Sequence, residues 1–188
     1  QPPTVTSTVP ANNAVNVPVD STITITFSEP VTVTGDWFTI SCTKSGTHTA
    51  AVEDTDPVYV LTPDPVFSTS DVCTVTVLAD NVNDDDSDDD TADYMLENYV
   101  FSFTTAEGCG DPFTPIYDIQ GNGAATPISG QTVTTEGIVT GDFQTGGKRG
   151  FFIQDEMGDD DPATSDGIFV YYPNAIEVNV GDKVRVTG

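Results

Sequence analysis

Apolar and polar residues alternate along most of the first half of the chain. In the segment from Ser21 to Ser28, Ile23, Ile25 and Phe27 fall on one face, which is the period of a half-buried strand. Similar short segments are Thr4 to Val9, Trp37 to Cys42, Ala50 to Val52, Val58 to Thr62, Asp71 to Leu78 and Tyr99 to Thr105. Turns rich in Pro, Gly and Asp separate them, and Pro10 to Pro18 is one such turn. The pattern predicts an all-β fold, with a β-sandwich and no helix over residues 1–107.

The same alternation returns in the second half after a break. Residues 108–115, GCGDPFTP, carry no hydrophobic period and combine Gly with Pro, so we expect a linker there. Residues 116–188 are predicted to form a second β module. Its expected strands are Gln131 to Phe143, Arg149 to Asp155, Asp166 to Tyr172 and Gly181 to Gly188.

Composition and charge limit the kinds of partner that the chain can bind. The 188 residues carry a net charge of −25 with only five Lys and Arg, which argues against binding to phosphate backbones or to anionic membranes. Because 37% of the residues are hydrophobic, the chain is still expected to fold. Abundant Thr, Val, Asp and Gly indicate an exported all-β protein. The sequence has no run that is long and apolar enough for a membrane span, and an export signal would have been removed or would lie outside this sequence.

The stretch from Asp80 to Asp93 is the most acidic part of the chain, with eight aspartates among fourteen residues. Carboxylates this close repel one another unless water or a hard cation separates them. Calcium, with about six to eight oxygen ligands, is the expected cation, although Asp89 and Met95 stand where an EF-hand loop needs Gly and Glu. A solvated loop without an ion is the alternative. The candidate ligands are Asp80, Asp84, Asp86, Asp88, Asp90 and Asp93.

A second acidic segment, Asp155 to Asp166, is predicted to be a loop between two strands. Its candidate calcium ligands are Asp155, Asp159, Asp160, Asp161 and Asp166. An exposed hairpin loop without an ion explains the same residues equally well.

Residues 2–105 resemble the bacterial Ig-like domains of surface-layer and other exported proteins. The resemblance rests on the order of three segments, PPTVTSTVPANNAVNVPVDSTITITFSEPV, YVLTPDPVFSTSDVCTVTVLADNVND and NYVFSFTT. It implies a structural role in spacing or displaying other modules, without catalytic residues. The chain departs from the family before the last strand, where an acidic insertion replaces a Gly-Asn turn.

Three cysteines are present, which leaves at least one without a partner in this chain. Cys42 ends one predicted strand and Cys73 begins another, and in a sandwich of this order the two strands can lie close enough to be bridged. We therefore expect a Cys42–Cys73 disulfide in an exported protein, with two buried free thiols as the alternative. Cys109, in the linker, is expected to be free or to pair outside this chain.

Residues 114–188 resemble the OB-fold-like module of secreted bacterial nucleases and related exported proteins. The matching motifs are IYDIQGNG, VTTEGIVTGDF, GFFIQD, DPATSDGIFVYY and VGDKVRVTG. The nuclease domain that such a module accompanies has no counterpart in these residues. An OB fold closes with about five strands, whereas four are predicted here, so the module is expected to lack its last strand or strands.

The sequence offers little catalytic chemistry. The single histidine, His48, lies in a polar stretch and is expected to be an exposed surface residue, and no nucleophile or phosphate-loop motif accompanies it. Nucleic-acid binding is an alternative function, because bases stack on aromatic rings in OB folds and Lys148 and Arg149 lie next to one of the strands that carry such rings. Alternating aromatics in a barrel are more often core, however, and the net acidity opposes this reading. These aromatics are Phe151, Phe152, Tyr171 and Tyr172.

We therefore predict a non-enzymatic, calcium-stabilised structural or display segment of an extracellular or cell-surface protein, with an association with a nuclease as one possibility. The alternative is a subunit of an extracellular filament. In that case the open edge at Val184 to Thr187 would accept a strand from the next subunit, with Gln1 to Pro10 as the donor.

Overall fold

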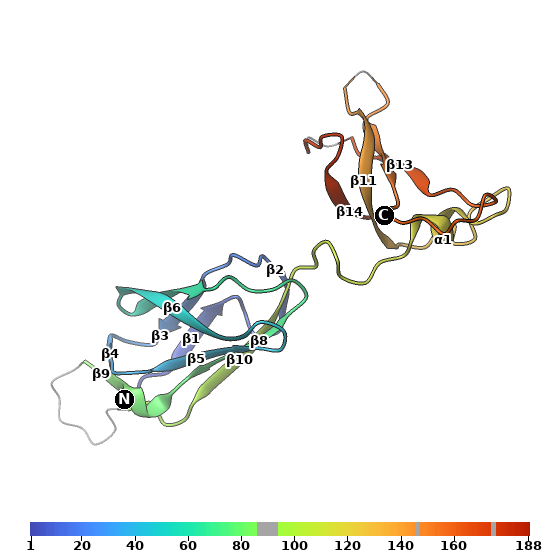
Figure 1. Cartoon of the computed structure of the whole chain (residues 1–188). Coiled ribbons are helices and arrows are strands. Elements are labelled where there is room, and N and C mark those ends of the chain that lie inside the picture. The colour runs from blue at the N-terminus through green and yellow to red at the C-terminus, as the bar shows by residue number, and fades with distance from the viewer. Residues whose placement is uncertain (86–93, 146, 174–175) are drawn as a thin grey trace. The chain divides into compact units, whose positions relative to one another are not determined.

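The computed structural model describes residues 1–85, 94–145, 147–173 and 176–188. The chain divides into two compact units, Gln1–Glu107 and Gly108–Gly188, and Figure 1 shows the strands of each. Within the described ranges, no helix has both the length and the apolar character needed to cross a membrane.

The first unit is built almost entirely from strands, which confirms the predicted all-β sandwich (Figure 1). Its elements are β1 (Val5–Val9), β2 (Ala14–Val17), β3 (Ile23–Phe27), β4 (Val31–Val33), β5 (Phe38–Cys42), β6 (Gly46–Thr55), β7 (Val58–Asp64), β8 (Val72–Val77), the short 3-10 helix η1 (Ala79–Asn81), β9 (Val82–Asp84) and β10 (Tyr99–Thr105). The alternating segments of the sequence correspond to β1, β3, β5, β6, β7, β8 and β10.

The strands of the sandwich follow the order β1-β3-β7-β6-β5-β8-β10-β2 in a single curled sheet. Strand β6 joins the two layers, because residues 46–48 pair with β5 and residues 49–55 pair with β7. On the far edge, β2 runs parallel to β10, with Phe103 opposite Ala14. A separate two-stranded ribbon pairs β4 with β9.

The core of the first unit follows the period of two. In β3, Ile23, Ile25 and Phe27 are buried while the threonines between them are only half-buried, as the alternation predicts. Tyr59 is also buried, and its hydroxyl donates to the Val31 carbonyl at 2.8 Å. An apolar ring with a bonded hydroxyl fills the interior without leaving a polar atom unsatisfied.

Three short strands of the first unit were not predicted. The region from Pro10 to Pro18 was expected to be a turn, but it contains the four-residue strand β2, in which Ala14 and Val17 pair with the edge of β10. Strands β4 and β9 have three residues each, too few to show a period. Strand β9 contains Asp84, so the acidic stretch begins inside the folded sandwich.

The described residues of the second unit form one short helix and four strands, α1 (Ile116–Gln120), β11 (Thr134–Phe143), β12 (Gly150–Gln154), β13 (Gly167–Tyr171) and β14 (Lys183–Thr187). The sheet order is β13-β12-β11-β14, and all pairs are antiparallel. A small core of Ile116, Val139, Phe151, Ile153 and Val178 lies against the sheet. The four strands agree with the alternating segments, whereas α1 was not predicted.

Close packing fixes Gly150 in β12. A Cβ atom on this residue would overlap with the Val170 carbonyl oxygen of the neighbouring strand β13. Only glycine fits where two backbones approach this closely.

The predicted linker is ordered at its beginning. The Arg185 guanidinium of β14 donates to the carbonyl oxygens of Asp111 and Pro112. The Gly110 amide donates to the carboxylate of Glu136 on β11. Residues 108–112 therefore belong to the second unit and lie against its sheet.

Candidate functional sites

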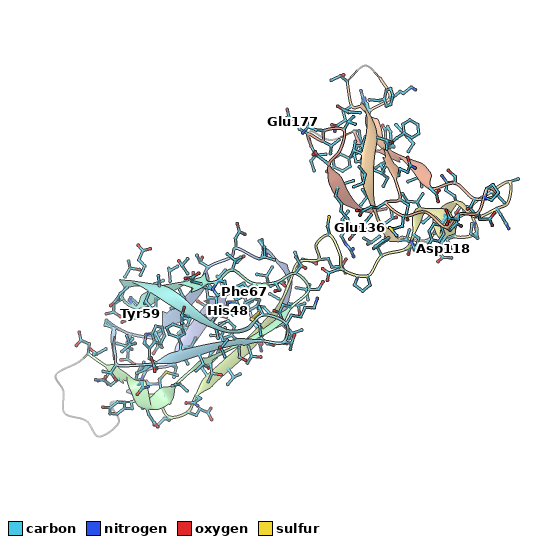
Figure 2. The ribbon with its side chains drawn as sticks, in the orientation of Figure 1. His48, Tyr59, Phe67, Asp118, Glu136 and Glu177 are labelled. Carbon is cyan, nitrogen blue, oxygen red and sulfur yellow. A yellow bond between two sulfur atoms is a disulfide. The ribbon has the colours of Figure 1, made fainter. Side chains whose placement is uncertain are left out.

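A buried polar network lies where the turn after β5 meets the connection from β7 to β8. His48 has an exposed fraction of only 6%, so the prediction that it is an exposed surface residue is wrong. Its ring contacts the Phe67 ring, with centroids 5.0 Å apart, and Figure 2 shows the two side chains together. Because Phe67 lies far from His48 in the sequence, local polarity around His48 gave no sign of this burial.

The imidazole has a partner on each side. His48 Nδ1 lies 2.7 Å from the Pro65 carbonyl oxygen, and Nε2 lies 2.7 Å from Ser45 Oγ. The Ser45 hydroxyl in turn donates to Asp71 Oδ2 at 2.6 Å. The serine thus lies between the histidine and the carboxylate, which is not the order of a Ser-His-Asp catalytic triad.

Asp71 is fully buried and accepts several hydrogen bonds. Thr43 Oγ1 and the Lys44 amide donate to Oδ1 at 2.9 and 2.7 Å, and the Ser45 amide donates to Oδ2 at 2.8 Å. Burial alone would raise the pKa of this carboxyl, but the hydrogen bonds from Ser45, Lys44 and Thr43 outweigh it and lower the pKa to about 2. Asp71 is therefore ionised at neutral pH.

The predicted disulfide is present beside this network. Cys42 and Cys73 are directly opposite each other on β5 and β8 and are bonded. Cys109 is a free, exposed cysteine, as expected. Asp71 lies near both bridged sulfurs, but their participation in the disulfide removes them as metal ligands.

Of the calcium ligands predicted in the first acidic stretch, Asp80 and Asp84 lie within the described residues. Asp80 is exposed on η1, and Asp84 lies in β9 opposite Val31. The remaining predicted ligands Asp86, Asp88, Asp90 and Asp93 lie outside the described residues.

Two further aspartates approach the start of this stretch from another part of the chain. The pKa of the Tyr59 hydroxyl is raised to about 12. Burial is the largest cause, and the negative charges of Asp54, Asp56 and Asp85 add to it. Asp54 and Asp56 flank the turn between β6 and β7, so the folded chain adds them to the acidic region. Their isolated positions in the sequence gave no signal of this proximity.

The second acidic segment brings several predicted ligands near α1. Partial burial, together with the charges of four aspartates, raises the pKa of the Tyr117 hydroxyl. These aspartates are Asp118, Asp155, Asp159 and Asp166. Asp118 was missed in the sequence because it lies on the unpredicted helix α1. Figure 2 labels it.

The carboxylates of this segment differ in their hydrogen bonds. Asp155 Oδ1 accepts from the Gly158 amide and Asp161 Oδ1 accepts from the Ala163 amide, at 3.1 and 2.9 Å. Asp159 accepts from the Thr164 hydroxyl at 2.9 Å. By contrast, Asp166 Oδ1 is buried without a hydrogen-bond partner. Asp160 is exposed.

The four residues around Tyr117 have the oxygen chemistry that calcium prefers, but they are not drawn into a tight cluster. Apart from the set at the disulfide, the described ranges contain no three His, Cys, Asp or Glu ligand atoms within 4.8 Å of one another. A bound cation would therefore have to draw these carboxylates closer together.

A cleft of about 420 Å³ lies between the terminal strands β13 and β14. Val170 and Val186 line its walls together with residues of the segment after α1. Thr135, also on its wall, is 5% exposed, and its hydroxyl is buried without a hydrogen-bond partner. The cleft is mainly apolar, with one unsatisfied polar group at its wall.

Most of the aromatic residues singled out in the second unit lie outside its core. Phe151 is buried, whereas Phe152, Tyr171 and Tyr172 are exposed by 36% or more, so the interpretation of this set as core is correct only for Phe151. Phe152 makes an edge-on contact with Phe143 at 5.8 Å, and Lys148 lies 4.9 Å above the Phe143 ring. Nucleic-acid binding at this face stays a prediction.

Comparison with known proteins gives one family match. The family described as "Bacterial Ig-like domain" matches residues 1–105. None of the curated proteins matches the chain.

Solved structures of surface-layer proteins also resemble the chain. The N-terminal part of the bacterial S-layer protein SbsC matches with 14% identity and a TM-score of 0.41, over 93% of this chain and 45% of that one. Domains 1–6 of SbsC match with 15% identity and a TM-score of 0.40, over 92% and 26% of the two chains. The present chain therefore spans less than half the length of these proteins.

Proposed function

Because the chain belongs to the family of bacterial Ig-like domains, we propose that it is a non-catalytic structural segment of an extracellular or cell-surface protein. The family match over residues 1–105 carries this proposal, since it covers the whole sandwich. In this role the sandwich spaces or displays the modules joined to it, among which a nuclease is one candidate.

The disulfide between Cys42 and Cys73 supports the location. Such bonds form and persist in oxidising compartments and are rare in the cytosol. This bond joins two central strands and is buried, so reduction would weaken the sandwich itself.

Surface labelling tests the location. Antibodies against the chain should bind intact cells of the source organism or detect the chain in the culture fluid. Added protease should remove the cell-bound signal without lysis. A signal that appears only after lysis, with Cys42 and Cys73 as free thiols, would contradict the proposal.

We further propose that calcium stabilises the segment through its acidic regions. Support comes from the four aspartates around Tyr117, one of which has a buried oxygen without a partner, and from Asp54 and Asp56 beside the first acidic stretch. A cation would reduce the mutual repulsion of these carboxylates and bind the unpaired oxygen of Asp166.

Thermal unfolding with calcium and with chelator tests this proposal. A ligand that binds only the folded state stabilises by about 2.7 kcal/mol at a hundredfold excess over its Kd. In the second unit, Asp166→Asn should lose the calcium effect. Glu177→Gln is the matched control, because Glu177 is an exposed carboxylate of the second unit outside the acidic segment. Equal melting midpoints with calcium and with chelator in the unmodified chain would eliminate the role of calcium.

A second candidate function is assembly by strand addition. The cleft between β13 and β14 favours it, because each of these strands has one neighbour in the sheet order and the cleft between them is apolar. Val184 to Thr187 pair with β11 of the same chain on one side. The proposed donor, Gln1 to Pro10, contains β1, which already pairs with β3, so a donor role would require β1 to leave its own sheet.

Light scattering and electron microscopy of the purified chain test the assembly. Filaments or a concentration-dependent mass are expected, and Val186→Lys should abolish them by placing a charge in the cleft. A monomer at all concentrations would rule out self-assembly through this edge.

A further inference from the structure

We propose that His48 is held as an imidazolium cation in the folded protein and acts as a pH-dependent lock. The lock fastens the turn between β5 and β6 to the connection between β7 and β8. It consists of His48, Ser45, Asp71 and the Pro65 carbonyl group. The contacts among these groups require one hydrogen more than a neutral imidazole and one hydroxyl supply.

The first hydrogen is fixed by the Pro65 carbonyl. A carbonyl oxygen accepts hydrogen bonds and cannot donate them. Since His48 Nδ1 lies 2.7 Å from this oxygen, Nδ1 must carry a hydrogen. A neutral imidazole has only one ring hydrogen, which this contact already uses.

The second hydrogen is fixed by the serine. Ser45 Oγ lies 2.6 Å from Asp71 Oδ2 and 2.7 Å from His48 Nε2, and each of these short contacts needs a hydrogen between its atoms. The hydroxyl supplies only one. An ionised Asp71 can only accept, so the serine hydrogen points to Oδ2 and Nε2 must donate to Oγ.

Asp71 is in the ionised form that this count requires. Both of its oxygens are occupied, because Oδ1 accepts from Thr43 and Lys44 while Oδ2 accepts twice from Ser45. These donors hold the pKa of Asp71 at about 2. Protonating this carboxyl would displace one of these donors, whereas protonating His48 displaces none.

The charged groups on the surrounding elements fit this assignment. On the turn, the Lys44 side chain donates to the Thr69 carbonyl at 3.0 Å. On the opposite connection, Asp64 precedes Pro65, and Asp71 is the acidic partner of His48 through Ser45. The ring makes an edge contact with the apolar Phe67 ring, and the residue paired with His48 on β5 is Ile40.

Solvent approaches the strand that carries His48. His48 lines a surface cleft of about 470 Å³ between β5 and β6, where β6 leaves one layer for the other.

Deprotonation of His48 should break one of these contacts. When His48 loses its Nε2 hydrogen, lone pairs on Nε2 and Ser45 Oγ face each other, and the turn must separate from the histidine or from Asp71. The folded chain thus binds one more proton than the unfolded chain in the pH range where free histidine is neutral. Because stability rises with pH only where the unfolded state binds more protons, the stability of the first unit falls as the pH rises through this range.

Nitrogen-15 NMR of the imidazole tests the protonation directly. The chain has a single histidine, so its side-chain signals need no assignment. At about pH 7.5, where a free histidine is mostly neutral, both ring nitrogens should have the shifts of protonated imidazolium nitrogens. The pattern of a single neutral tautomer at this pH would overturn the proposal.

Urea unfolding as a function of pH tests the consequence. Trp37 is the only tryptophan and is buried in the first unit, so its fluorescence reports that unit in the full chain. The unfolding constant should rise by up to about tenfold per pH unit in the range where free histidine is neutral while folded His48 keeps its proton. Ser45→Ala should remove this slope, and Ser41→Ala, an exposed serine on β5, should keep it. The same slope in Ser45→Ala would contradict the lock.

Discussion

The Arg185 guanidinium lies 2.7 Å from the carboxylate of Glu136, and the two side chains are only 10% and 2% exposed. The pair joins the adjacent strands β14 and β11, on which the two residues are directly opposite each other. The same two side chains also bind residues 110–112. One buried ion pair therefore holds both the edge of the sheet and the segment that enters the unit.

Removing one member of this pair should strongly destabilise the second unit. We expect Arg185→Ala to cost about 3–5 kcal/mol, because it leaves the buried Glu136 carboxylate with only the more distant Lys183 ammonium, at 3.9 Å. Urea unfolding followed by the amide NMR signals of β11 measures the loss. Glu156→Ala is the control, since its bond to Lys183 lies between side chains exposed by 43% and 61%, and such pairs contribute about 0–1 kcal/mol. Similar losses in the two variants would contradict this account of the pair.

Reduction of the disulfide should weaken the first unit alone. Cys42 and Cys73 are separated by 31 positions, and in the chain-entropy model a loop of this size contributes about 3–4 kcal/mol. The double variant Cys42→Ala and Cys73→Ala should shift the unfolding of Trp37 to lower urea by this free energy. Cys109→Ala, which removes the exposed thiol, should leave the transition unchanged.

Asp71 should make the first unit sensitive to acid. Its pKa falls from 3.8 to about 2 in the folded state, so its stabilisation is complete above about pH 4 and is lost as the pH falls towards 2. The shift corresponds to about 2 kcal/mol. Asp71→Asn should therefore be less stable at neutral pH and lose less stability between about pH 5 and pH 2. Exposed Asp36→Asn is the control, and an unchanged acid transition in Asp71→Asn would disprove the role of this carboxylate.

Replacing Thr135 with valine should stabilise the second unit. The Thr135 hydroxyl is buried without a partner, and valine has the same shape without the polar atom. Removing an unsatisfied buried hydroxyl should gain about 1 kcal/mol, measured by urea unfolding. Thr134→Val is the matched control, because the Thr134 hydroxyl is 2.8 Å from that of Thr187 and its removal should bring no gain.

Alternation in the sequence was sufficient to predict the long strands and the fold class. The segment from Asp71 to Leu78 shows why, since Cys73, Val75 and Val77 are all fully buried in β8. Strand β9 has only three residues, so its pairing with β4 depends on tertiary contacts and leaves no periodic signal. Helix α1 was missed for a related reason, because its five residues make little more than one turn.

The candidate sites were less predictable than the fold. The disulfide was predicted because Cys42 and Cys73 lie at the ends of recognisable strands. The environment of His48 was not predicted, because it is formed by Pro65 and Phe67, which lie in the connection between β7 and β8. Similarly, Asp118 joins the second acidic segment only through the packing of α1, since more than thirty residues separate them in the sequence.

The parallel pairing of β2 with β10 has a mechanical consequence for a protein tethered at both ends of its sandwich. The N-terminus and the point where the chain leaves the first unit lie at opposite ends of that unit (Figure 1). Tension from the N-terminus first meets β1, which pairs with β3. Tension that passes beyond β1 pulls β2 from its leading end and β10 from its trailing end, and because the strands are parallel, the load runs along both in opposite directions. Bonds such as that from the Ala106 amide to the Val17 carbonyl are then loaded in shear. The strands resist together instead of peeling apart one bond at a time.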